Sequence, residues 1–60
     1  MNIKQELQNT CWEKYTIDDL NQHKGYIRDI FLTAYQVWLW EQRGKKHKAN
    51  QLRKQISQYI

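Results

Sequence analysis

The clearest helical pattern in this chain lies in residues 27–43, IRDIFLTAYQVWLWEQR. Large apolar side chains recur in this stretch at intervals of three and four residues, which places them along one side of an α-helix. This apolar stripe consists of Ile27, Ile30, Phe31, Ala34, Tyr35 and Trp38. The stretch therefore predicts one long amphipathic helix that ends near Arg43, and Gly44 directly after it is typical of a helix C-cap.

The residues ahead of the long helix predict a first helix over residues 2–15. Three positions spaced by four residues form its apolar face, namely Ile3, Leu7 and Cys11. Cys11 is the only cysteine, so the chain has no internal disulfide framework. Its place on the apolar face predicts a small buried thiol.

Thr16 predicts the start of a new helix at Ile17. The threonine hydroxyl can accept a hydrogen bond from a first-turn amide, and Asp18 and Asp19 place negative charge at the positive end of the helix dipole. Gly25 then interrupts the helical pattern, and we expect the helix to kink or to stop at this glycine.

The last third of the chain predicts a helix over residues 46–60. Its apolar face comprises Ala49, Leu52, Ile56, Tyr59 and Ile60. The chain thus gives three helices with one apolar stripe each, which pack around a shared centre. We therefore predict an all-α fold, a small three-helix domain with a long central helix. It occupies residues 1–60 as a single domain and is either monomeric or dimeric.

Length and composition exclude several classes of protein. A chain of 60 residues buries only about 60% of its unfolded surface, which leaves a thin core. The longest uninterrupted apolar run covers residues 37–40, whereas a membrane-spanning helix needs about 20 apolar residues. The first residues lack the apolar stretch of a secretory signal. We therefore expect a soluble protein of the cytoplasm without a transmembrane segment.

No combination of residues predicts catalysis. Cys11, His23 and His47 could supply a nucleophile and a base, but each stands alone in its local sequence. Helix capping explains the pair of Asp18 and Asp19. The two glycines are nineteen residues apart and cannot form a phosphate-binding loop. We expect no enzyme activity, no catalytic residue, no metal, no cofactor and no small-molecule substrate.

The long helix is apolar beyond its stripe. Leu32 and Leu39 lie roughly 120–140° around the helix from Ile27, and Trp40 projects from nearly the opposite side. In so small a fold the chain cannot cover all of Leu32, Leu39, Trp38 and Trp40. Either the first helix wraps over this flank, or a second copy or another protein covers it. The predicted partner-binding residues are Leu32, Tyr35, Leu39, Trp40 and Arg43.

Basic residues gather in the last third of the chain. Residues 44–60 contain five lysines and arginines and no acidic residue: Lys45, Lys46, Lys48, Arg53 and Lys54. Lysines at a helix start face the positive end of the dipole, so another interaction is expected to favour them. Phosphates of a nucleic acid or an acidic protein surface would do so. A solvated face that keeps the protein in solution is the simpler interpretation.

Two functions fit these surfaces. The first is a non-enzymatic helical regulator that binds a larger protein through the aromatic flank of the long helix, with the basic last helix steering it toward an acidic surface. The second is a small DNA- or RNA-binding regulator, in which the basic residues contact phosphates and the aromatic flank forms a homodimer. A membrane-surface helix is less favoured because the last helix has a narrow apolar stripe.

Overall fold

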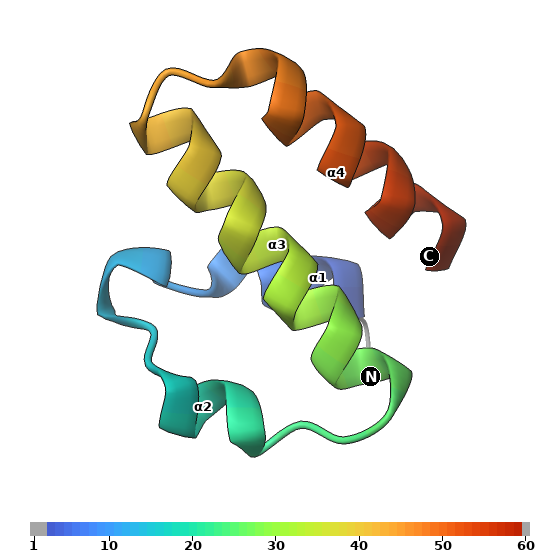
Figure 1. The fold of residues 1–60 in the computed structure, drawn as a ribbon. Helices are drawn as coiled ribbons and strands as arrows, with labels where there is room; N and C mark the ends of the chain where they lie inside the picture. Colours follow the sequence, from blue (N-terminus) through green and yellow to red (C-terminus); the bar gives the residue numbers. More distant parts are fainter. Residues whose placement is uncertain (1–2, 60) are drawn as a thin grey trace.

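The protein consists of five helical elements in the structure, a computed structural model that describes residues 3–59. These are α1 (Ile3–Asn9), the 3-10 helix η1 (Trp12–Lys14), α2 (Ile17–Asn21), α3 (Tyr26–Gln42) and α4 (Lys46–Tyr59) (Figure 1). The described residues contain no strand, which confirms the all-α class, and α3 is the predicted long central helix. Four α-helices replace the three expected because the chain breaks at residues 22–25, between α2 and α3. A further break at residues 10–11 separates α1 from the 3-10 helix η1.

Helices α3 and α4 form an antiparallel hairpin that carries most of the core (Figure 1). The buried apolar side chains come from α2, α3 and α4: Leu20, Ile30, Phe31, Ala34, Val37 and Ala49. Ile30 and Ala49 are both 0% exposed, and the small alanine lets the backbone of α4 approach α3 closely. Val37 lies outside the predicted stripe and is buried because α4 packs against that flank of α3.

The end of α3 is a Schellman motif built on Gly44. This glycine has a φ of 76°, in the left-handed region, and its amide donates to the Glu41 carbonyl at 3.1 Å. The Lys45 amide donates to the Trp40 carbonyl at 2.8 Å. Both bonds satisfy carbonyls that the end of the helix would otherwise leave unpaired. The predicted C-cap glycine is confirmed.

Helix α2 begins at the predicted cap. The Asp19 amide donates to the Thr16 hydroxyl oxygen at 3.2 Å, and the Thr16 amide donates to the Asp19 carboxylate at 3.1 Å. This reciprocal pair is a capping box. The helix stops at Asn21, and Gly25 reverses the chain with a φ of 64° before α3 begins. Of the two outcomes expected at Gly25, the structure shows the stop.

The first helix is shorter than predicted. Helix α1 ends at Asn9, where the Thr10 hydroxyl donates to the Glu6 carbonyl at 2.7 Å. The prediction that Cys11 is a buried thiol on this helix is wrong, since Cys11 follows the helix and is exposed. The chain turns here because the ring of Trp12 packs against α3. Residue 2 of the predicted first helix and residue 60 of the predicted last helix lie outside the described residues.

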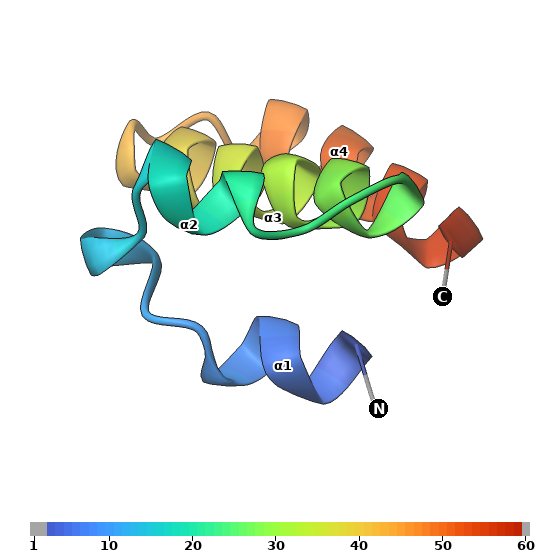
Figure 2. The same cartoon turned by 90° about the horizontal axis from the view of Figure 1, so that it is seen from below.

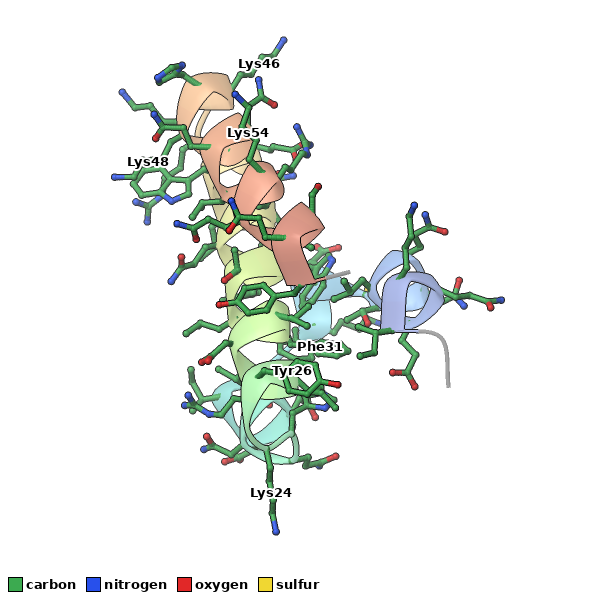
Figure 3. The ribbon with its side chains drawn as sticks, turned by 90° about the vertical axis from the view of Figure 1, so that its right-hand side faces the viewer. Lys24, Tyr26, Phe31, Lys46, Lys48 and Lys54 are labelled. Atoms are coloured by element: carbon green, nitrogen blue, oxygen red, sulfur yellow. The ribbon has the colours of Figure 1, made fainter. Side chains whose placement is uncertain are left out.

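Helix α1 stands apart from the layer formed by α3 and α4 (Figures 2 and 3). It contains no buried residue, although Ile3, Glu6 and Leu7 are partly covered. Helix α1 covers one face of the α3–α4 hairpin only loosely, so a hollow remains between them. A second hollow is lined by residues of the α3–α4 hairpin, with none from α1.

Candidate functional site

One hollow lies on the α3–α4 hairpin and contains residues from both predicted surfaces. We call it the Trp40 hollow; its volume is about 320 Å³. Its lining comprises Gln36, Leu39, Trp40 and Arg43 of the α3 segment and Lys48 and Leu52 of α4. The volume lies at the small end of the range for ligand pockets, roughly 300–1,000 Å³, so the hollow suits one or two side chains of a partner.

Two cations lie over the indole ring of Trp40. The Lys48 ammonium nitrogen is 4.6 Å from the ring centroid, and the Arg43 guanidinium carbon is 5.6 Å from it. Both distances are within the range of a cation–π interaction. The contacts hold the ring in place and put two positive charges beside two apolar walls, Leu39 and Leu52.

The structure brings three of the five predicted partner-binding residues to this hollow. Leu39, Trp40 and Arg43 line it, and the leucine and the tryptophan remain half-buried. Leu32 is seven residues before Leu39, two helical turns, and so lies on the same side of α3 without reaching the hollow. Trp38 is also half-buried, which agrees with the expectation that the chain cannot cover all four large side chains.

Tyr35, the fifth predicted residue, lies elsewhere. Its ring belongs to an intramolecular aromatic cluster, with centroids 6.1 Å from Trp12, 5.9 Å from Tyr15 and 6.1 Å from Trp38. Contacts of this kind stabilise the packing of η1 on α3. The structure therefore gives Tyr35 a role in the fold rather than in the Trp40 hollow.

The five predicted basic residues are all exposed, but they do not share one face. Arg53 forms an ion pair with Glu41 and donates to the Asn50 side chain at 2.8 Å. Lys46 and Lys48 are 200° apart on a helical wheel at about 100° per residue, and Figure 3 shows them on opposite sides of α4. Lys48 thus belongs to the Trp40 hollow, whereas Lys45 lies in the loop and Lys54 farther along α4.

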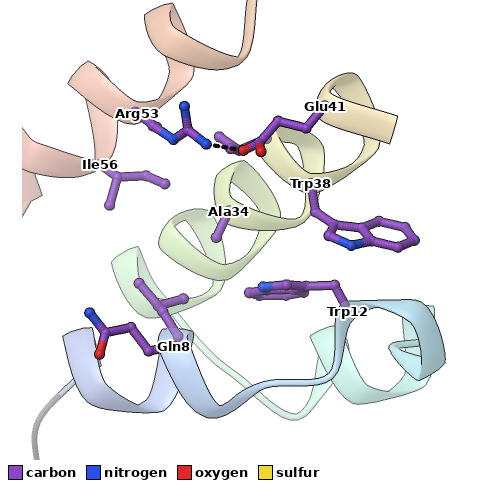
Figure 4. A pocket seen from close by; sticks show the side chains of 9 residues that line it. Gln8, Trp12, Ala34, Trp38, Glu41, Arg53 and Ile56 are labelled. Atoms are coloured by element: carbon purple, nitrogen blue, oxygen red, sulfur yellow. Dashed lines mark hydrogen bonds and ion pairs between the residues drawn. The ribbon is translucent and has the colours of Figure 1, made fainter. Parts of the chain in front are cut away.

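A second hollow, the α1 groove, was not found by sequence reasoning. It has a volume of about 250 Å³ and lies between α1, η1, α3 and α4 (Figure 4). Its lining is mostly apolar and comprises Leu7, Gln8, Trp12, Ala34, Val37, Trp38, Glu41, Arg53 and Ile56. The Glu41–Arg53 ion pair closes one edge. The break at residues 10–11, which separates α1 from η1 on the wall of this groove, has no strong signal in the sequence.

A third feature of the structure is a pair of partly buried side chains near α2, Tyr15 and His23. The hydroxyl oxygen of Tyr15 is buried and has no hydrogen-bond partner among the described residues. Burial, and then the negative charge of Asp19, raise the pKa of this hydroxyl above its ordinary value. The ring of His23 stacks on Phe31 with 4.0 Å between centroids and 11° between planes. His23 thus follows the end of α2 and packs on the core.

Within residues 3–59 the structure contains no cluster of three or more histidine, cysteine and acidic side chains that could hold a metal ion. No helix in this range is both long enough and apolar enough to cross a membrane. Comparisons of the chain with protein-family models, curated proteins and solved structures found no match.

Proposed function

We propose that the chain is a small non-enzymatic regulatory protein of the cytoplasm that binds a larger protein through the Trp40 hollow. The observation that carries the proposal is the convergence of Leu39, Trp40 and Arg43 on one hollow, with Lys48 and Leu52 supplied by α4. Tryptophan and arginine are enriched among the residues that dominate binding energy at protein interfaces, and such residues cluster in the desolvated centre of the contact.

The charge around the hollow supports the same proposal. Residues 43–48 include four lysines and arginines, so the loop end of the hairpin is strongly positive. Positive charge at the rim of an interface raises the rate of association with an acidic surface and disfavours basic partners. The apolar walls then supply affinity, and the basic rim supplies steering.

Nucleic-acid binding is the second candidate, favoured by the exposed lysines at residues 45, 46, 48 and 54. Three features make it the weaker one. Lys48 already covers the face of Trp40 that would stack on a base. Arg53 is paired with Glu41. Lys46 and Lys48 extend in opposite directions from α4 (Figure 3). A phosphate backbone is contacted best by basic side chains that share one face.

The proposal is tested by recovering proteins with a tagged chain from its own cells. The variants Leu39→Ser and Trp40→Ser should lose the recovered partner, because each removes apolar surface from the hollow. Ile17→Ser and Tyr26→Ser are matched controls, since these side chains are 65% and 58% exposed and lie at other sites. All four should retain the helical circular dichroism spectrum, so that loss of folding is not mistaken for loss of binding.

The outcomes separate the two candidates. Equal recovery with Leu39→Ser and with Ile17→Ser would contradict the proposal. A titration into labelled duplex DNA tests the other candidate, because five phosphate contacts give a slope of log affinity against log salt of about −4 to −5. Binding with that slope at physiological salt, abolished by replacing Lys45, Lys46 and Lys48 with glutamine, would establish the nucleic-acid function instead.

A further inference from the structure

Among the residues that the structure describes, two cations and no anion line the Trp40 hollow. Arg43 and Lys48 both lie within 5.6 Å of the Trp40 ring centroid, measured to the guanidinium carbon and the ammonium nitrogen. The acidic residue nearest to Trp40 in the sequence is Glu41, which is paired with Arg53 at the edge of the α1 groove. The hollow therefore presents uncompensated positive charge beside apolar walls.

Neighbouring residues increase this positive charge. Residues 42–59 contain no aspartate or glutamate, and Arg43, Lys45, Lys46 and Lys48 fall within six consecutive positions. Lys46 and Lys48 also stand in the first turn of α4, near the positive end of its dipole, where cations are unfavourable. Negative charge from a partner would relieve both the repulsion among these residues and the unfavourable dipole interaction.

The shape of the hollow favours a helical partner. Its walls come from two antiparallel helices, with Leu39 on α3 and Leu52 on α4, so the hollow is part of the seam between them. A groove between helices accepts the apolar face of an amphipathic helix, whose anchoring side chains recur every three or four residues. The described residues form no strand, so they offer no sheet edge to which an extended peptide could add.

We infer that the partner segment is an acidic amphipathic helix, an inference that rests on the proposed function. One large apolar side chain of this helix enters the Trp40 hollow between Leu39 and Leu52. Carboxylates one turn away from that anchor bind Arg43 and Lys48, and the Lys48 ammonium exchanges part of its contact with Trp40 for a carboxylate.

The inference is tested with three synthetic helical peptides of equal length and equal apolar face. Their polar positions flanking a central leucine anchor carry glutamate, glutamine or lysine, and fluorescence anisotropy measures binding to the full chain at low and at physiological salt. We expect the glutamate peptide to bind at least tenfold more tightly than the glutamine peptide. This preference should shrink as salt rises, because salt screens the exposed charges.

Matched variants locate the charge effect. The double variant Arg43→Gln and Lys48→Gln should remove most of the preference for glutamate. The double variant Lys46→Gln and Lys54→Gln changes the net charge equally but should weaken binding less than twofold. Replacing Arg43 and Lys48 with glutamate should reverse the preference, so that the lysine peptide binds more tightly than the glutamate peptide.

The results distinguish failure of this inference from failure of the proposed function. Equal affinity for the glutamate and glutamine peptides, both lost with Leu39→Ser, would overturn the acidic partner and leave the hollow as a binding surface. Peptide binding that does not depend on Leu39 or Trp40 would overturn the hollow itself. If both double variants lose the preference for the glutamate peptide equally, the preference depends on net charge alone and the inference is overturned.

Discussion

The Lys48 ammonium lies 4.6 Å from the centroid of the Trp40 ring, and this contact joins the first turn of α4 to the last turns of α3. The side chain therefore links the fold to the candidate binding surface. It covers an indole that would otherwise be more exposed, and it keeps a positive charge at the rim of the hollow. Because Lys48 has both roles, its substitution can be measured for its effect on stability and, in a separate experiment, for its effect on binding.

Replacing Lys48 with methionine should lower the free energy of unfolding by about 0.5–1 kcal/mol relative to the same change at Lys46, the value of an exposed cation–π contact. Methionine retains most of the aliphatic length and removes the charge. Lys46→Met is the matched control, because Lys46 also stands in the first turn of α4, where removal of a cation relieves the unfavourable dipole interaction, but does not line the hollow. Urea denaturation monitored by circular dichroism measures both changes. Equal changes at Lys46 and Lys48 would exclude the contact with Trp40 as the cause.

Replacing Gly44 with alanine should destabilise the protein by about 1 kcal/mol. The cost comes from the φ of 76°, which disfavours an L-residue, and not from a clash, since an added Cβ meets no atom within 4 Å. Chemical synthesis gives a sharper control, because D-alanine at the same position accepts a positive φ and should stabilise the fold slightly. The melting temperatures of the two variants should move in opposite directions. If both melting temperatures decrease, the positive φ at residue 44 is not the cause of the lost stability.

Replacing Ile30 with alanine should cost about 2–5 kcal/mol, because Ile30 is fully buried and the truncation leaves a cavity in the core. The total stability of so small a domain is only a few kcal/mol, so the variant is expected to be largely unfolded at 25 °C. Ile17→Ala removes the same atoms from a side chain that is 65% exposed. This control should keep its melting transition, and comparable losses at both sites would contradict the observed core.

Replacing Tyr15 with phenylalanine should stabilise the protein by about 1 kcal/mol at neutral pH, because the buried hydroxyl has no partner among the described residues. Its raised pKa adds a pH dependence. The folded state retains the proton more firmly than the unfolded state, so the stability of the parent protein is lost as pH rises above about 10. The gain from Tyr15→Phe should therefore grow from pH 9 to pH 11. Melts that show a constant or shrinking gain would contradict this assignment.

The sequence contained enough information for the hairpin and its ends. The three- and four-residue spacing of Ile30, Phe31 and Ala34 predicted the buried face of α3, since that periodicity arises directly from helix geometry. The caps at Thr16 and Gly44 were also predictable because they depend on hydrogen bonds and dihedral angles within a few residues. Local chemistry decided these features.

The first fifteen residues were not predictable in the same way. A spacing of four through Ile3, Leu7 and Cys11 fits one helix, but the packing of Trp12 on Phe31 and Tyr35 stops it after Asn9. That packing joins residues about twenty positions apart, and helix periodicity contains no information about it. The α1 groove and the cluster around Tyr35 follow from this break. Three of the five predicted partner-binding residues line the Trp40 hollow because α3 was predicted correctly, but the hollow itself was not predicted.

Site-specific photocross-linking in the chain's own cells is the most direct test of whether a larger protein binds at the Trp40 hollow. A benzophenone amino acid at Gln36, on the wall of the Trp40 hollow, is compared with the same group at Ile17, which lies in α2 away from it. We expect a cross-linked product heavier than two copies of the 7.5 kDa chain from position 36 only. The product should also be lost when Leu39 is replaced by serine. A product from position 17 alone, or only a dimer of the chain from position 36, would contradict binding of a larger protein at this hollow.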